Sequence, residues 1–207
     1  MREAVTPVVL AGGAGTRLGG VNKALVEIGG QRVIDRLLAA LRPLGPEIII
    51  VSNDDSLLGL PGTRVVRDVE RGGGALMGLY SGLRAVRTPL ATATACDMPF
   101  VSTAVLEALI ALAPGYDAVV PVLGGQAEPL HAVYRTTCVP AIEAALAAGQ
   151  KRLISFFAPL RIRYVAEAEL RRWDPELRSF LNVNRPEDLA HARALAAAER
   201  AGGPDQR

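Results

Sequence analysis

Short apolar runs alternate along the chain with longer segments in which apolar residues recur every three to four positions. The runs have the length of buried strands, and the longer segments have the spacing of a helix face, as at Val33, Leu37 and Leu41. Strand–helix–strand order of this kind requires right-handed crossovers and a mainly parallel sheet with helices on both faces. The sequence therefore predicts an α/β fold, a three-layer α/β/α sandwich of Rossmann-like form.

The periodicity also sets approximate bounds for each element. The expected strands are residues 5–10, 48–51, 65–66, 90–95, 118–122 and 162–165, with 181–183 as a further candidate. The expected helices are residues 33–41, 75–86, 103–112 (capped by Ser102), 137–148 and 186–199. We find no repeat, linker or break in composition, so we expect one domain across residues 1–207, with a frayed tail at about 201–207.

Composition and charge exclude several classes of protein. Half of the residues are hydrophobic, and the formal net charge is only +2. This near-neutral charge does not indicate a nucleic-acid or membrane partner. No apolar run approaches the ~20 residues of a membrane span, and no signal peptide is visible. Cys96 and Cys138 lie outside any metal-binding spacing. We expect a cytoplasmic protein in which both cysteines are small buried side chains.

A glycine-rich segment follows the first expected strand. Residues 10–23 read L-A-G-G-A-G-T-R-L-G-G-V-N-K, with five glycines among nine residues. Because glycine has no side chain, successive N–H groups can face an anion, and Arg17 and Lys23 add positive charge. A polyphosphate suits this arrangement. The spacing fits neither the P-loop nor the dinucleotide fingerprint, so on these residues alone a plain glycine-rich turn is an equally good interpretation.

Polar residues also follow the next three expected strands. In parallel sheets the ligand lies beyond the carboxyl ends of the strands, which places Asn53, Asp68 and Asp97 at one edge. A carboxylate at the end of a buried strand needs a partner, and Mg²⁺ prefers one or two carboxylates plus substrate phosphates. We therefore expect Asp97 to be a Mg²⁺ ligand, the alternative being a helix N-cap ahead of Pro99. Asn53 suits contact with a base or ribose, or simply a turn.

The segment L-A-G-G-x-G-T-R-L followed by a lysine resembles the signature of the NTP-transferase family, which has a nucleotide-diphospho-sugar-transferase fold. The resemblance implies that Arg17, Lys23 and Asp97 are catalytic, the two cations neutralising the triphosphate and the leaving pyrophosphate. It implies that Asp68 contacts the base. The implied nucleotide- and cofactor-binding residues are Leu10, Ala11, Gly12, Gly13, Lys23, Asn53, Asp68, Gly74, Gly78, Asp97, Asn182 and Asn184.

Four further segments resemble the molybdenum cofactor guanylyltransferase branch of that family. They read G-G-G-A-L-M-G at 72–78, C-D-M-P-F at 96–100, E-P-L-H-A-V-Y-R at 128–135 and F-L-N-V-N-R-P-E-D-L at 180–189. This resemblance covers roughly residues 5–195. It implies transfer of GMP from GTP to the terminal phosphate of Mo-molybdopterin, giving the guanine dinucleotide cofactor and pyrophosphate, with Mg²⁺ at Asp97. It places Asn182 and Asn184 on the pterin-phosphate side, and it suggests molybdenum insertion proteins or apo-molybdoenzymes as partners.

Three departures from this branch keep an alternative open. The branch usually has aspartate where Asn22 stands and proline where Ala75 stands. The motif G-T-R-L at 15–18 is closer to that of the sugar transferases. CTP as the nucleotide, or another phosphorylated acceptor such as a sugar phosphate, is the alternative. A nucleotide-binding regulatory protein without turnover is a second, against which Lys23 and Asp97 argue.

Two features outside these segments have an open or structural interpretation. Arg161, Arg163, Arg171 and Arg172 either meet an anionic acceptor or a partner, or form a solvated charged face, which is the commoner case. To His131 we assign no catalytic role.

Overall fold

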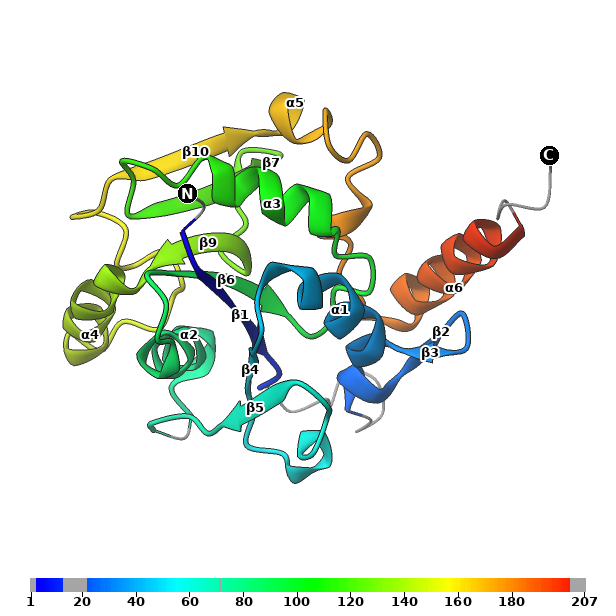
Figure 1. Ribbon diagram of the computed structural model, residues 1–207, viewed down its shortest axis with the longest axis horizontal. Coiled ribbons are helices and arrows are strands. Elements are labelled where there is room, and N and C mark those ends of the chain that lie inside the picture. Colours follow the sequence, from blue (N-terminus) through cyan, green and yellow to red (C-terminus); the bar gives the residue numbers. More distant parts are fainter. Residues whose placement is uncertain (1–2, 13–21, 71, 202–207) are drawn as a thin grey trace.

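The computed structural model describes residues 3–12, 22–70 and 72–201 (Figure 1). The predictions for Gly13, Arg17 and the tail at 202–207 lie outside these residues. The strands are β1 (Val5–Leu10), β2 (Glu27–Ile28), β3 (Gln31–Arg32), β4 (Ile48–Val51), β5 (Thr63–Val66), β6 (Leu90–Ala95), β7 (Ala118–Leu123), β8 (Gln126–Ala127), β9 (His131–Arg135) and β10 (Ile162–Ala166). The α-helices are α1 (Val33–Leu41), α2 (Gly74–Ala85), α3 (Thr103–Ala111), α4 (Val139–Ala147), α5 (Glu167–Leu170) and α6 (Pro186–Ala201). Short 3₁₀ turns are η2 (Lys23–Leu25), η3 (Arg42–Leu44), η4 (Asp55–Leu57), η5 (Thr136–Cys138) and η6 (Arg178–Phe180).

One central sheet carries the fold. Its strand order is β10-β7-β9-β6-β1-β4-β5, with β8 paired to β7. β1 pairs in parallel with β4 and β6, β4 with β5, and β7 with β10, whereas β9 runs antiparallel between β6 and β7. The prediction of a mainly parallel α/β sheet is confirmed. Strand β9 was not predicted, because its sequence H-A-V-Y-R contains a histidine, a tyrosine and an arginine and does not look like an apolar run.

Helices cover both faces of this sheet. Successive residues of a strand point to opposite faces, so Val5 and Val9 of β1 pack with α1 and α3, while Val8 and Leu10 pack with α2 and α4. In β4 the same alternation places Ile48 and Ile50 in one cluster and Ile49 and Val51 in the other. Each face thus has its own hydrophobic cluster, and Figure 1 shows the helices that cover the two faces. This confirms the predicted three layers, while the assignment of residues 1–207 to one domain stays a prediction.

Two glycines bring α2 close to the carboxyl end of β1. A Cβ on Gly82 would lie 2.6 Å from Cγ1 of Val8, and a Cβ on Gly78 would lie 3.1 Å from Cδ2 of Leu10. A side chain at Gly82 would therefore force the helix or the strand to shift, and one at Gly78 would press on the Leu10 side chain. The close approach leaves the first turns of α2 beside the loops that follow β1 and β5.

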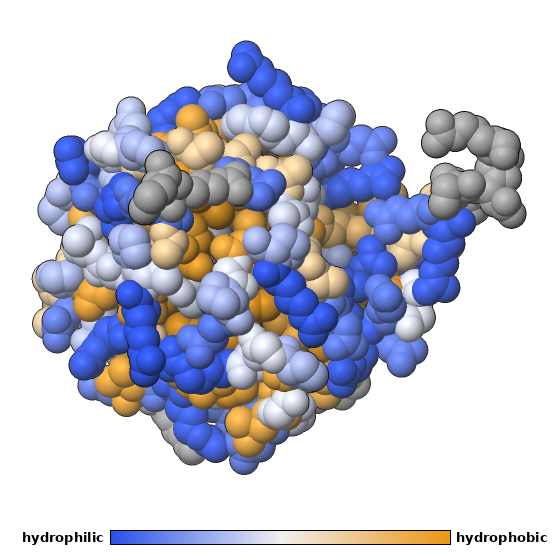
Figure 2. Space-filling model, viewed as in Figure 1, coloured by the Kyte–Doolittle hydropathy of each residue, from blue (hydrophilic) through white to orange (hydrophobic). Residues whose placement is uncertain are grey.

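A third, smaller cluster lies beside the sheet. The β2–β3 hairpin contributes Ile28, α6 contributes Ala192 and Ala196, and Phe100 and Val183 complete the contact. Figure 1 shows α6 beside this hairpin and away from the sheet, and Figure 2 shows hydrophilic residues predominating along the outline of the molecule, including this helix. The far end of α6 is fixed by Glu199, which pairs with Arg36 at 3.0 Å.

The predicted strand at 181–183 is wrong. Residues 181–184 have no regular structure, and the N–H of Val183 donates to the carbonyl of Asp97, in the turn after β6, at 2.8 Å. Val183 is apolar because it is buried in the third cluster, not because it belongs to a strand. The helix expected at 137–148 begins instead with a 3₁₀ turn, and α4 starts at Val139 with Pro140 in its first turn, where the missing N–H costs nothing.

Among the residues that the structure describes, no helix combines the length and the apolar character needed to cross a bilayer.

Candidate active site

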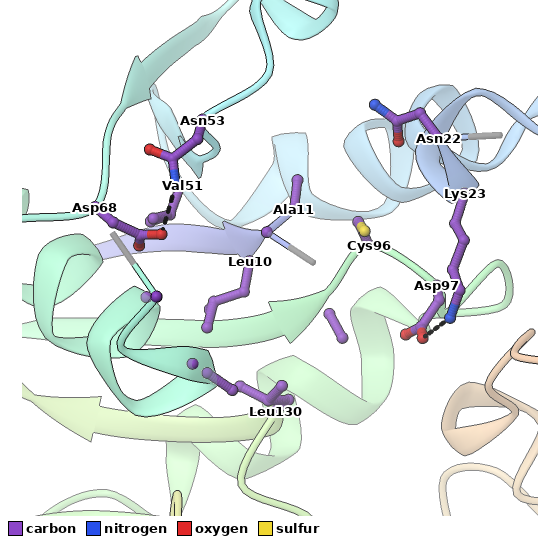
Figure 3. A pocket seen from close by; sticks show the side chains of 16 residues that line it. Leu10, Ala11, Asn22, Lys23, Val51, Asn53, Asp68, Cys96, Asp97 and Leu130 are labelled. Atoms are coloured by element: carbon purple, nitrogen blue, oxygen red, sulfur yellow. Dashed lines mark hydrogen bonds and ion pairs between the residues drawn. The ribbon is translucent and has the colours of Figure 1, made fainter. Parts of the chain in front are cut away.

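A cavity of about 520 Å³ opens beyond the carboxyl ends of β1, β4, β5 and β6 (Figure 3). Its lining includes nine of the residues predicted to bind the nucleotide: Leu10, Ala11, Gly12, Lys23, Asn53, Asp68, Gly74, Gly78 and Asp97. The size suits a small-molecule ligand. Of the other three predicted residues, Gly13 lies outside the described part, and Asn182 and Asn184 do not line the cavity.

Backbone bonds just past the strands bring these residues together. The N–H of Ala11 donates to the carbonyl of Val51 at 2.9 Å, and that of Cys96 donates to the carbonyl of Leu10 at 3.0 Å. The sheet ladder thus extends one residue beyond β1 and β6. Because the strands are parallel, the residues that follow it leave the sheet at the same edge.

Lys23 and Asp97 form one end of the cavity. The Lys23 ammonium lies 3.3 Å from Oδ2 of Asp97, and each side chain is 17% exposed. The ammonium also donates to Oδ1 of Asn184 at 2.6 Å. Among the described residues, Oδ1 of Asp97 has no hydrogen-bond partner. A fixed cation and a carboxylate with a free oxygen therefore stand side by side, an arrangement suited to phosphate and to a metal ion.

The alternative that Asp97 caps a helix is wrong. Helix α3 begins at Thr103, and its cap is Ser102, whose Oγ accepts from the N–H of Val105. This confirms the predicted Ser102 cap. It also leaves the Asp97 carboxylate without the local structural role that the sequence allowed.

Asn53 and Asp68 form the opposite end of the cavity. The Asn53 amide donates to Oδ2 of Asp68 at 2.8 Å. Oδ1 of Asp68 is buried and has no partner among the described residues. A buried carboxylate oxygen normally has a donor, so this atom is available to accept an N–H or O–H of a ligand in the cavity. In Figure 3 the backbone of Leu10 and Ala11 lies between this pair and the Lys23–Asp97 pair.

Asn22 has a structural role where the resembling family has an aspartate. Its Oδ1 caps η2 by accepting from the N–H of Ala24 at 3.0 Å, and its amide donates to Oδ2 of Asp54 at 2.7 Å and to Oγ of Ser56 at 3.2 Å. An aspartate at 22 would face the Asp54 carboxylate without a proton to donate. The asparagine therefore fixes the turn that presents Lys23.

The two asparagines of the C-terminal segment have different surroundings. Asn184 reaches the site through Lys23, whereas the amide of Asn182 donates to the carbonyl of Phe180 at 3.4 Å. No local pattern predicts the contact between Asn184 and Lys23, because 161 positions separate the two residues.

Neither cysteine is poised for nucleophilic attack. Cys138 is buried as expected, while Cys96 is half-buried and lines the cavity. Burial raises the pKa of each thiol to about 12, so both remain protonated at neutral pH. We therefore assign no nucleophilic role to Cys96, the cysteine that lines this cavity.

The arginines of the second half are mostly neutralised by neighbouring acids. Arg163 pairs with Glu169 at 2.8 Å, Arg171 with Glu167 at 2.7 Å, and the exposed Arg161 with Asp117 at 3.5 Å. The solvated charged face is the interpretation that these pairs favour.

His131 lies beneath the site and is fully buried. Both ring nitrogens lack a hydrogen-bond partner among the described residues, and the ring packs against Phe180 at 4.5 Å between centroids. Burial lowers the pKa of His131 to about 4, against a smaller opposite effect of the Asp174 charge. The residue thus joins β9 to the segment that carries Asn184, which is a packing role.

We expect His131 to make the protein sensitive to acid. The folded state holds the imidazole neutral down to a pKa of about 4, whereas in the unfolded chain the imidazole has its ordinary pKa of 6.5. The contribution of His131 to the free energy of unfolding is therefore fully present above pH ~6.5 and is lost as the pH falls toward ~4. The complete loss amounts to about 3 kcal/mol. Between about pH 7.5 and pH 5, urea unfolding of the wild type should lose roughly 2 kcal/mol more than that of His131→Leu. An identical loss in both proteins would contradict this assignment.

Comparisons with known proteins agree with this architecture. Residues 7–166, more than half of the chain, match the MobA-like NTP transferase domain. A probable molybdenum cofactor guanylyltransferase of Pelotomaculum thermopropionicum is 38% identical over 200 residues, which cover 95% of this chain and 96% of the relative. A molybdenum cofactor guanylyltransferase of Desulfosudis oleivorans is 36% identical over 200 residues, covering 96% and 98%.

A solved structure shares both the fold and part of the sequence. The crystal structure of molybdopterin-guanine dinucleotide biosynthesis protein A from Archaeoglobus fulgidus superimposes with a TM-score of 0.81 at 29% identity, covering 93% of this chain and 99% of that one. The domain match, the near full-length relatives and this structure agree on one assignment. The chain belongs to the MobA-like NTP transferase family.

Proposed function

We propose that this protein transfers GMP from GTP to the terminal phosphate of Mo-molybdopterin, forming the guanine dinucleotide cofactor and releasing pyrophosphate. The observation that carries the proposal is a cavity with two polar ends, Lys23–Asp97 at one and Asn53–Asp68 at the other. It lies in a chain 38% identical to a probable molybdenum cofactor guanylyltransferase. A nucleoside triphosphate likewise has two different ends, the base at one and the phosphates at the other.

The base is assigned to the Asp68 end. Guanine presents two adjacent donors, its ring N1–H and its 2-amino group. The unpartnered Oδ1 of Asp68 supplies an acceptor for one of them, and Oδ2, which already accepts from Asn53, has a second lone pair. Cytosine presents only one exocyclic donor group on its pairing edge. The carboxylate therefore favours GTP over CTP.

The phosphates are assigned to the Lys23 end. The acceptor phosphate attacks the α-phosphorus in line, the new P–O bond forms as the bond to the β-phosphate oxygen breaks, and pyrophosphate leaves. The acceptor is already ionised, so no protein nucleophile is required. Lys23 then contributes a fixed positive charge where negative charge accumulates, and the cavity contributes alignment. Arg17 keeps its proposed role beside the triphosphate.

Mg²⁺ is the metal that we propose for this site, with Asp97 as its protein ligand. Within the described residues no group of three or more His, Cys, Asp or Glu side chains forms a metal cage. A single carboxylate with a free oxygen beside a phosphate site suits an ion that takes most of its ligands from substrate and water. When bound, the ion supplies charge neutralisation on the phosphate oxygens.

The test is pyrophosphate release by the purified protein with Mg²⁺, molybdopterin and either GTP or CTP. We expect release with GTP, dependent on molybdopterin and abolished by a chelator, and at least tenfold less with CTP. Heat-treated protein and a reaction without acceptor are the controls. Equal or greater release with CTP would contradict the base assignment, and release with a sugar phosphate alone would contradict the acceptor.

The product is a cofactor that has to reach another protein. We propose that a molybdenum insertion protein or an apo-molybdoenzyme takes it over from this site. We also propose a cytoplasmic location, where GTP is available and where the free thiols of Cys96 and Cys138 persist.

A further inference from the structure

Lys23 is held in place from the C-terminal part of the chain. Its ammonium donates to Oδ1 of Asn184 at 2.6 Å, closer than its 3.3 Å contact with Asp97. Lysine has a long, flexible side chain, so a single acceptor at hydrogen-bond distance decides where its charge lies. The position of the Asn184 side chain therefore sets the position of the Lys23 charge.

Asn184 is itself positioned by its backbone. The N–H of Val183 donates to the carbonyl of Asp97 at 2.8 Å, and the N–H of Asn184 donates to Oδ2 of Asp188 at 2.9 Å. Residues 181–184 have no strand or helix to stiffen them. These two consecutive bonds hold the backbone that leads into the Asn184 Cα.

Asp188 makes this contact from the first turn of α6. Its Oδ2 also accepts from the N–H of Arg185 at 2.8 Å, so one oxygen holds both residues that precede Pro186. This is the reaching-back half of a capping box, in which a side chain in the first helical turn satisfies N–H groups before it. The N–H donors of Asn184 and then of Arg185 lower the pKa of Asp188, so the carboxylate is ionised when it holds them.

We propose that Asp188 is a positioning residue for Lys23, acting through Asn184, and so couples the first turn of α6 to the phosphate end of the cavity. Asp188 does not line the cavity and touches no substrate in this scheme. Removing its carboxylate frees the backbone of Asn184 and withdraws Oδ1 from the ammonium, which leaves Asp97 as the remaining side-chain contact of Lys23 among the described residues. The kinetic part of this proposal rests on the proposed function, whereas the geometric part does not.

The chain offers an internal reference for the geometric part, because its only lysines are Lys23 and the exposed Lys151. An acylating reagent modifies amines that are free and not held as hydrogen-bonded ammonium groups. With acetic anhydride at limiting concentration and mass spectrometry of the two peptides, Asp188→Ala should raise the Lys23/Lys151 labelling ratio three- to tenfold. Asp188→Glu, which keeps an acceptor in the first helical turn, should restore the wild-type ratio. An unchanged ratio in Asp188→Ala would overturn the proposal.

Two control variants separate positioning from general loss of structure. Glu187→Gln removes the neighbouring exposed charge and should leave the ratio unchanged. Ala196→Gly loosens α6 within the third cluster, far along the helix from Asn184. It should lower the thermal midpoint at least as much as Asp188→Ala without changing the ratio. If Ala196→Gly raises the ratio as much as Asp188→Ala does, the effect is general loosening and the proposal fails.

Kinetics give the second readout. In the pyrophosphate assay, Asp188→Ala should lower kcat about tenfold with a smaller change in the KM for GTP, because the cation is displaced mainly from the charge of the transition state. Asp188→Glu should recover most of that loss. A raised labelling ratio together with wild-type kcat would overturn the catalytic part of the proposal. Absence of turnover in the wild type with any nucleotide would instead contradict the proposed function and leave the labelling result standing.

Discussion

Asp97→Asn is expected to lower kcat for pyrophosphate release by about 10²- to 10³-fold while the protein stays folded. The substitution keeps the size of the side chain and removes its charge. It takes away the free carboxylate oxygen proposed for Mg²⁺ and, at the same time, the ion pair of Lys23, which lies 3.3 Å away. Thermal unfolding should shift by only a few degrees, because the neutral amide can still accept from the ammonium. Steady-state rates at saturating GTP and molybdopterin measure the effect.

Asp117→Asn is the matched control. Like Asp97, Asp117 is a partly exposed carboxylate paired with a basic side chain, in this case that of Arg161. It precedes β7, however, and so lies at the amino ends of the parallel strands. That edge is opposite the cavity, so this variant should keep kcat within about twofold of wild type. Near wild-type turnover in Asp97→Asn would contradict both the metal assignment and the importance of the Lys23–Asp97 pair.

Much of the fold was predictable because the central strands are buried on both faces. β1, β4 and β6 have the predicted bounds, since each is an almost wholly buried run of aliphatic side chains without a charged residue, interrupted in β1 and β6 only by threonine or proline. The position of the site follows from the same strands. Once they are parallel, Gly12, Asn53 and Asp97 have to leave the sheet at one edge.

The misses came from segments whose environment is not set by their own sequence. β9 is buried with a histidine and a tyrosine in it, because neighbours on both sides enclose it. The sequence of residues 181–184 resembles a short strand, yet the segment packs against α6. Its N–H groups at Val183 and Asn184 donate to the carbonyl of Asp97 and to the carboxylate of Asp188. Local patterns hold no information about partners that are far away in sequence.

The site shows the same division between local and distant information. Resemblance placed Asn182 and Asn184 together on the pterin side, whereas the structure gives them different contacts. Asn22 counted as a departure from the family, and its three hydrogen bonds at η2 supply a structural reason for the asparagine. That departure therefore concerns how Lys23 is presented and says little about the choice of base, which depends on the other end of the cavity.

Asp68→Asn is expected to lower kcat/KM for GTP by about 10²-fold and to improve the use of xanthosine triphosphate. Guanine offers N1–H and a 2-amino group, and a carboxylate accepts from both, with each charge-assisted bond worth about 1.5–3 kcal/mol. An amide can accept only one and turns its own NH₂ toward the other. Xanthine keeps N1–H but carries an oxygen in place of the 2-amino group, so the amide matches it. Pyrophosphate release with both nucleotides, each titrated to saturation, gives the ratio.

Asp55→Asn is the control for this exchange, because Asp55 is an exposed carboxylate in the neighbouring η4 turn whose partner is Arg67. It should leave the preference between the two nucleotides unchanged. Asp68→Asn should also leave kcat at saturating xanthosine triphosphate close to the wild-type value with GTP, since the Lys23–Asp97 pair, which we propose as the phosphate site, lies at the opposite end of the cavity (Figure 3). A fall in kcat with both nucleotides and no exchange of preference would mean that Asp68 supports the structure of the loop after β5. An exchange of preference would tie the base to the unpartnered Oδ1 of Asp68, and with it the orientation of the whole triphosphate toward Lys23 and Asp97.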